Sequence, residues 1–226
     1  MSRTEVEPNV PENKQERPVI ICPGFHPPAL TDCFVQSVFS QSIFGQSVLN
    51  LDPSNANQKV SSLELSVQFC PLVVDAFCAN PAAVFDWMTQ TLGSPNQKAD
   101  PILAIGFSGG VVGMAGALAF WRQQGGQVAN FLAIDGWGMP IVGLPVCRLS
   151  HDEFTHWSTL PLGAGKVNFY ADPSVEHLQM WGNPNQVSGQ VREGWQTQKG
   201  QQMTVTEFVR QVLKMSVKGN GYLDFS

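Results

Sequence analysis

Charge is scarce in this sequence, and the scarcity argues against several classes of function. Only 14% of the 226 residues are Asp, Glu, Lys or Arg, and the formal net charge at pH 7 is −5. A nucleic-acid-binding protein needs a basic face, so we expect no nucleic-acid partner. The 43% hydrophobic content, with 14 Phe and 6 Trp, instead predicts a well-packed globular chain of a size that suits one α/β domain.

The sequence also lacks an uninterrupted apolar segment long enough to cross a membrane. The nearest approach, 102–120, contains several glycines and Ser108, a pattern that indicates a buried strand followed by a helix. The first residues are polar and carry no apolar signal-peptide region, so we interpret 1–17 as a flexible arm. No internal repeat or second domain is apparent, and we expect a single domain over 18–226.

Cysteine pairs with metal-site or redox spacing are absent. The cysteines are odd in number and none forms a C-x-x-C pair. This usage predicts reduced, buried thiols in a cytoplasmic protein. The residues concerned are Cys22, Cys33, Cys70, Cys78 and Cys147.

The most informative motif that is present is Gly106-Phe-Ser-Gly-Gly110, a G-x-S-x-G pattern centred on Ser108. An apolar run precedes it and a helix rich in Ala and Gly follows. On a strand–turn–helix of this kind the serine is pushed out above the sheet, and the glycines let strand and helix approach closely. In these features the sequence resembles the α/β-hydrolase family.

Short apolar runs separated by helical segments predict an α/β fold, a three-layer sandwich whose reduced, mostly parallel sheet has about five or six strands. Such sheets hold their sites at the carboxyl ends of the strands. We interpret 139–165, rich in Pro, Gly, His and Trp, as an irregular lid or pocket wall. The clearest strand candidates are 18–22, 102–105, 129–134 and 166–171.

The family resemblance implies a catalytic triad in the chain order Ser, acid, His. Ser108 is the expected nucleophile, and His177, between the last strand candidate and the last helix, is the expected base. Two aspartates are candidates for the acid. Asp135, at the end of the strand after the motif, is preferred over Asp172, which lies only five residues before His177.

The resemblance also implies an oxyanion hole built from backbone N–H groups. The expected donors are Phe25, in the loop after the first strand, and Gly109, the residue after the nucleophile. His26 and Trp137 are expected to line the substrate pocket. A rigid turn without chemistry is the alternative interpretation of the loop around Phe25.

The sequence does not favour a metal site at His151 and His156. Their spacing of five suits one helix face poorly, and no further ligand pair is apparent. We interpret 151–156 as a polar loop with capping and rim contacts, and we expect no metal or cofactor.

These residues together predict a serine hydrolase that cleaves a small-molecule ester or thioester through an acyl-enzyme. Peptidase activity on the same triad is not separable from esterase activity by these motifs. The alternative from another class is a non-catalytic α/β-hydrolase-like scaffold that binds a ligand or a protein partner in the same cleft.

Overall fold

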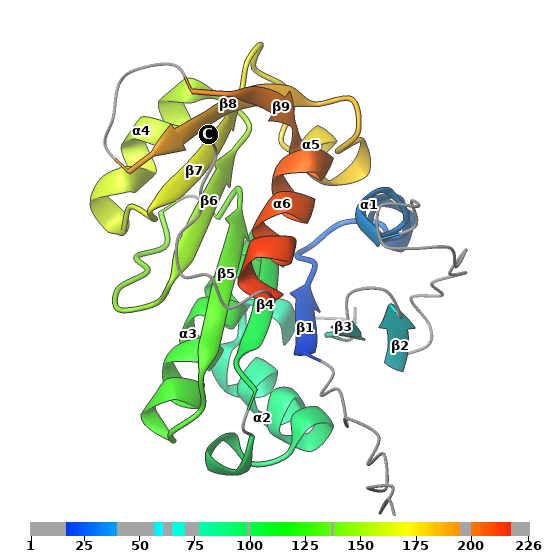
Figure 1. Cartoon of the computed structure of the whole chain (residues 1–226), viewed down its shortest axis with the longest axis vertical. Coiled ribbons are helices and arrows are strands. Elements are labelled where there is room, and N and C mark those ends of the chain that lie inside the picture. The colour runs from blue at the N-terminus through cyan, green and yellow to red at the C-terminus, as the bar shows by residue number, and fades with distance from the viewer. Residues whose placement is uncertain are drawn as a thin grey trace, which may run out of the picture.

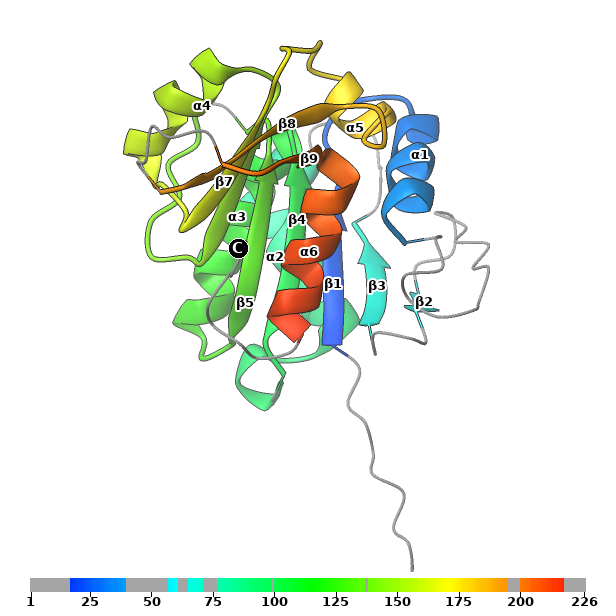
Figure 2. The same ribbon diagram turned by 45° about the horizontal axis from the view of Figure 1, so that its top comes forward.

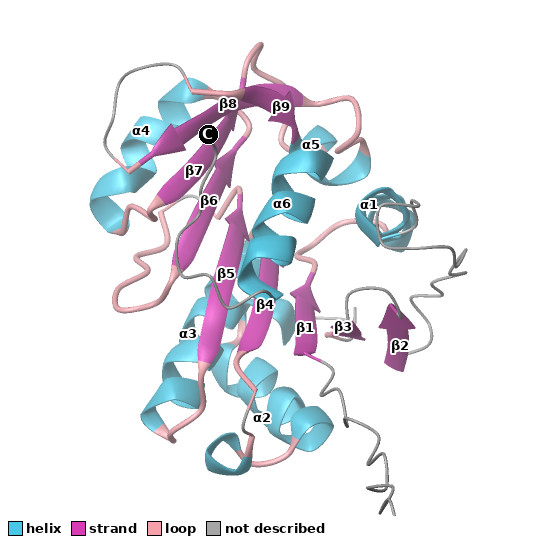
Figure 3. Ribbon diagram, in the orientation of Figure 1, coloured by secondary structure: helices cyan, strands magenta, loops and turns pink. Residues whose placement is uncertain are grey.

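A computed structural model describes residues 17–39, 57–60, 65–70, 77–98, 100–136, 138–194 and 200–217. These residues build one sheet of nine strands in the order β2-β3-β1-β4-β5-β6-β7-β8-β9 (Figures 1 and 3). The strands are β1 (Arg17–Cys22), β2 (Asn57–Val60), β3 (Leu65–Phe69), β4 (Ile102–Phe107), β5 (Val128–Ile134), β6 (Val146–Ser150), β7 (Val167–Ala171), β8 (Ser188–Glu193) and β9 (Gln202–Thr204).

The helices are α1 (Pro28–Phe39), α2 (Pro81–Leu92), α3 (Gly109–Gln123), α4 (Glu153–Thr159), α5 (Gln179–Gly182) and α6 (Val205–Val217), with 3-10 turns η2 (Phe77–Ala79), η3 (Pro95–Gln97) and η4 (Leu160–Leu162). In the sheet, β3, β1, β4, β5, β6 and β7 run parallel, whereas β2, β8 and β9 are antiparallel to their neighbours. The α/β class and the mostly parallel sheet are therefore as expected, but the sheet is larger than five or six strands.

Helices cover both faces of the sheet, with α6 on the side opposite α2 and α3 (Figures 1 and 2). One buried cluster joins the sheet to α1, α5 and α6, and a second joins it to α2 and α3. Every position of β4 is buried, because a central parallel strand is covered on both faces. The continuous apolar run before the serine motif thus follows from the place of its strand in the sheet.

The small residues of α3 let this helix lie close to the end of β1. A Cβ placed on Gly110 would come within 2.1 Å of the Cys22 carbonyl oxygen, and one on Gly113 equally near the Cys78 carbonyl. Such contacts are shorter than any real side chain permits. The glycines of α3 are therefore required by packing, and they bring the start of the helix up to the carboxyl edge of the sheet.

Residues 139–165 are not the irregular segment that the sequence predicted. They contain β6, α4 and η4. Strand β6 lies between β5 and β7 in the sheet, and every one of its residues is buried. The pattern was obscured by Arg148, a buried arginine whose guanidinium donates to the carbonyls of Met139, Leu162 and Gly163. Burial lowers the pKa of Arg148 to about 10, so it stays charged at neutral pH.

Four of the five cysteines are buried, Cys33 is exposed, and all five are free thiols. Within the described ranges, no helix is long and apolar enough to span a lipid bilayer.

His156, on α4, is a fully buried histidine with an unusual environment. Its ring packs against Tyr170 at 5.2 Å between centroids, and neither ring nitrogen has a hydrogen-bond partner among the described residues. Burial, reinforced by the charge of Arg192, lowers the pKa of His156 to about 4. Between about pH 4 and about pH 6.5 the folded protein therefore keeps this imidazole neutral, whereas an unfolded chain would protonate it.

Replacing His156 by leucine should make folding less sensitive to acid. The unfolded state takes up the proton below about pH 6.5 and the folded state only below about pH 4, so wild-type stability falls as pH falls through this window. When the pH falls from about 8 to about 5, this linkage lowers the free energy of unfolding of the wild type by about 2 kcal/mol, and His156→Leu does not undergo this loss. Urea unfolding at both pH values measures the difference. An equal loss in both proteins would show that His156 does not titrate as described.

Candidate active site

The carboxyl edge of the parallel strands gathers the chemically active side chains. Ser108 follows β4, Asp135 follows β5, His151 follows β6, and His177 lies in the turn between β7 and α5. Because these strands are neighbours in the sheet, their ends meet at one edge (Figure 1). Ser108, Asp135 and His177 were expected here, and His151 was not.

Ser108 occupies the strained turn between β4 and α3. Its backbone has φ 52° and ψ −121°, a combination that non-glycine residues seldom adopt, and its N–H donates to the Ile134 carbonyl at 2.9 Å. The motif glycines allow the turn because a Cβ on Gly106 would lie 3.0 Å from the Val111 Cα. This is the geometry of a nucleophile elbow, in which the serine projects from the sheet edge.

The loop after β1 lies against this elbow. A Cβ on Gly24 would come within 2.4 Å of the Phe107 carbonyl oxygen and 3.2 Å of the Ser108 Cβ, and Gly24 has a positive φ of 68°. The ring of Phe25 packs over Gly109, and 59% of Phe25 remains exposed. Gly109 begins α3, where backbone N–H groups have no partner within the helix. The two expected oxyanion-hole residues thus come together beside Ser108.

His177 is oriented by one hydrogen bond and one ring stack. Its Nδ1 lies 2.8 Å from Asp135 Oδ2, and its ring stacks on Phe107, the residue before Ser108, at 4.8 Å between centroids and 19° between planes. A carboxylate only accepts hydrogen bonds, so Nδ1 carries a proton, and in the neutral ring Nε2 then has the lone pair. That is the tautomer a general base requires.

The stack beneath His177 continues into the core. Phe107 stacks on Trp181 at 5.1 Å, and Trp181 stacks on Phe34 of α1 at 3.7 Å. The indole N–H of Trp181 donates to Thr31 Oγ1 at 3.2 Å, which fixes its orientation. The His177 ring is therefore supported by a column of aromatic rings, in which Phe107, Trp181 and Phe34 are fully buried.

His151 binds the other oxygen of the same aspartate. Its backbone N–H and its Nδ1 lie 2.9 Å and 3.0 Å from Asp135 Oδ1, and its Nε2 lies 3.3 Å from Asp152 Oδ2. The hydrogen bond with Asp135 raises the pKa of His151 despite its partial burial. The sequence interpretation of 151–156 as a capping loop holds for Asp152, which caps α4 at Thr155 N, but it missed the contact of His151.

Asp135 is the centre of the arrangement. It is 2% exposed and, like Ser108, has a positive φ, here 51°. Burial alone would raise the pKa of this carboxyl, but the hydrogen bonds from His151 and His177 outweigh burial and hold the pKa below its usual range. Asp135 is therefore an anion at neutral pH, with one imidazole on each oxygen.

The structure describes two of the three remaining candidate residues. Asp172, the alternative acid, accepts a hydrogen bond from Gln190 Nε2 on β8 at 3.3 Å. His26 lies edge-on to Phe107 at 5.5 Å, and burial lowers its pKa. Trp137 lies outside the described residues.

His151 and His156 do not belong to one group of metal-ligating side chains. His156 is buried in α4, whereas His151 belongs to a different group, formed with Asp135 and His177. In that group one ligand atom from each residue lies within 4.8 Å of the other two.

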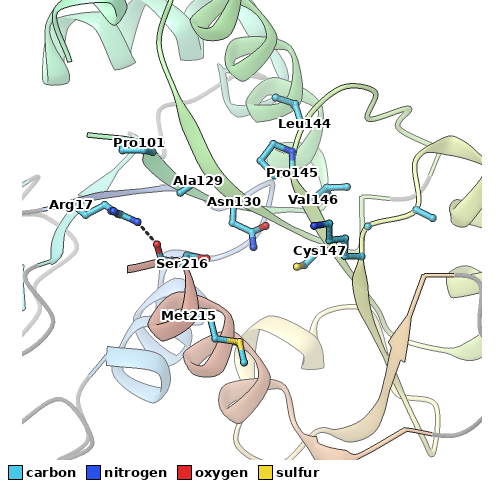
Figure 4. A pocket seen from close by; sticks show the side chains of 13 residues that line it. Arg17, Pro101, Ala129, Asn130, Leu144, Pro145, Val146, Cys147, Met215 and Ser216 are labelled. Carbon is cyan, nitrogen blue, oxygen red and sulfur yellow. Dashed lines mark hydrogen bonds between the residues drawn. The ribbon is translucent and has the colours of Figure 1, made fainter. Parts of the chain in front are cut away.

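A cavity of about 450 Å³ opens at the opposite, amino edge of the sheet (Figure 4). Arg17, which begins β1, and Val146, which begins β6, line it, together with Cys147 and Met215. Burial raises the pKa of Cys147 to about 12, so this thiol is not a nucleophile at neutral pH. Among the described residues that line it we find no paired nucleophile and base, so we do not place the chemistry there.

No protein-family model matches the sequence, and no significantly similar curated protein was found. The candidate site is therefore argued from its geometry alone.

Proposed function

We propose that this chain is a serine hydrolase of the α/β-hydrolase kind, which cleaves an ester or thioester through an acyl-enzyme. The observation that carries the proposal is the 2.8 Å hydrogen bond from His177 Nδ1 to Asp135, with the His177 ring stacked on the residue before Ser108. It supplies an oriented base with a free Nε2 at the edge where a strained serine projects.

The reaction begins when His177 Nε2 removes the proton of Ser108 Oγ, which attacks the carbonyl carbon of the substrate. The carbonyl π electrons move to oxygen, and the backbone N–H groups of Phe25 and Gly109 stabilise that oxyanion. The intermediate collapses with expulsion of the alcohol or thiol, which takes the proton from His177. Water, activated by the same Nε2, then releases the carboxylic acid and restores Ser108.

Asp135 contributes by staying ionised. Its charge holds the Nδ1 proton of His177 and stabilises the imidazolium that forms during attack. The pKa of Asp135 is held below its usual range, so the carboxylate does not become protonated at neutral pH. Asp135 is accordingly the acid that we assign in preference to Asp172.

The acyl group of the substrate is proposed to be apolar. Phe25 beside Gly109 is 59% exposed, and Leu178, next to His177, is 43% exposed. Exposed apolar side chains beside Gly109 and next to His177 favour an acyl chain over a charged group.

Pre-steady-state hydrolysis of p-nitrophenyl esters of increasing acyl length tests the proposal. An acyl-enzyme predicts a burst of about one p-nitrophenolate per chain, followed by slower turnover. The rate should rise from acetyl to longer acyl chains. A folded protein that binds these esters without releasing p-nitrophenolate would contradict catalysis and leave the binding scaffold as the function.

A further inference from the structure

Three potential metal ligands meet at one point of the candidate site. They are Asp135, His151 and His177, which come from the ends of β5 and β6 and from the turn after β7. One ligand atom from each residue lies within 4.8 Å of the other two. The spacing of histidines along the sequence could not show this, because the ligands lie on three separate segments.

The donor set suits a divalent transition metal. Two imidazole nitrogens and one carboxylate are a common Zn²⁺ ligand set, with bonds of about 2.0–2.2 Å and a fourth position left open. Tetrahedral ligands at that distance lie about 3.4 Å from one another. At present His177 Nδ1 lies 2.8 Å from Asp135 Oδ2 and His151 Nδ1 lies 3.0 Å from Asp135 Oδ1, so each nitrogen faces a different oxygen. One ligand atom from each residue lies within 4.8 Å of the other two, so a modest movement of the side chains would bring the three around one ion. Zn²⁺ would take the place of the two Nδ1 protons.

The surrounding groups resemble the outer shell of a metal site. Metal-bound histidines usually donate their other N–H to a carboxylate, and here Asp152 Oδ2 lies 3.3 Å from His151 Nε2. The Asp135 carboxylate is also fixed, because the backbone N–H of His151 donates to it at 2.9 Å. The side chains of His151 and His177 are 24% and 31% exposed, which leaves a path from solvent.

We propose that Asp135, His151 and His177 bind one divalent transition-metal ion of the Zn²⁺ class, and that the bound ion switches off hydrolysis at Ser108. The bound ion would coordinate Nδ1 of His177 and the carboxylate of Asp135. The hydrogen bond between these two groups would then be lost, and with it the orientation of His177 as a base. Binding stands independently of the proposed function, whereas the inhibition rests on it.

The test is a titration of the full chain with Zn²⁺ in competition with a chromophoric chelator. A Cys33→Ser background removes the exposed thiol. One ion per chain is expected. His151→Gln should weaken binding by at least about 100-fold, because loss of an outer-shell partner alone costs 10–100-fold. His156→Leu, which removes a histidine outside the cluster, should bind Zn²⁺ as the background does. Absence of stoichiometric binding, or binding unchanged in His151→Gln, would overturn the site.

A second set of measurements separates the site from the proposed function. Ser108→Ala should bind Zn²⁺ with unchanged affinity, since the serine is not a ligand. Ester hydrolysis by the background protein should fall in proportion to occupancy and return when EDTA is added. Hydrolysis that rises with Zn²⁺ would keep the site but refute both the inhibition and the metal-free serine mechanism. Hydrolysis unaffected at full occupancy would refute the inhibition alone.

Discussion

Replacing Ser108 by alanine is expected to lower kcat/KM for p-nitrophenyl esters by at least about 10⁴-fold. The hydroxyl is the proposed attacking atom, and Ser108 lies at the edge of the sheet where Asp135 orients His177. Initial rates across a range of ester concentrations give the comparison. Activity within tenfold of wild type would show that the serine is not the nucleophile.

Ser108→Ala is a clean test because the substitution keeps a Cβ at the same strained backbone. We expect the free energy of unfolding to change by less than about 1 kcal/mol, as urea denaturation will report. Ser158→Ala, on α4, is the matched control, because its hydroxyl donates only to the Thr155 carbonyl of its own helix. This variant should hydrolyse the esters at the wild-type rate.

Replacing Asp135 by asparagine should reduce kcat by about 10³- to 10⁴-fold. The amide carries no charge to stabilise the His177 imidazolium, and its NH₂ group cannot accept the Nδ1 proton. The ring would then be held in the wrong tautomer or released from its contact. The kcat values of wild type and variant, measured with the best ester of the series, test this.

Asp172→Asn is the control for Asp135→Asn, because Asp172 is the other candidate acid of the sequence. It accepts a hydrogen bond from Gln190 on β8, whereas Asp135 holds His177 Nδ1, so we expect kcat within about threefold of wild type. If Asp172→Asn proved the more damaging of the two, the assignment of the triad acid would be reversed.

The positions of the candidate site residues were predictable because their signals are local. Ser108 and Asp135 each follow an apolar run that must be a buried strand, and His177 follows another. Two helix starts carry signals of the same local kind. The Asn80 side chain caps α2 by accepting from Ala82 N and Ala83 N, and Thr204 and Glu207 form the reciprocal capping bonds that start α6.

Two strands that the sequence did not predict, β6 and β8, carry polar residues at buried positions. Arg148 lies in the middle of β6, and Gln190 and Arg192 lie in β8, yet each is at least 93% buried. Their partners, such as the Met139 carbonyl for Arg148 and the Tyr170 hydroxyl for Arg192, lie on other segments. Apolar periodicity therefore fails where long-range hydrogen bonds make a buried charge tolerable.

His151 was missed for a related reason. Its partner Asp135 is sixteen residues away along the chain, and the two meet only because β5 and β6 are neighbours in the sheet. Since β6 was not predicted, no sequence signal placed His151 at the carboxyl edge. The His–Asp–His arrangement is a property of the strand order.

The central claim is that Ser108 is an activated nucleophile, and covalent labelling tests it most directly. A fluorophosphonate probe reacts with a serine whose proton a neighbouring base removes. Wild type should gain the mass of one phosphonyl group on the peptide that contains Ser108, and Ser108→Ala should gain none. A folded wild-type protein that stays unlabelled, or equal labelling of both proteins, would contradict the claim.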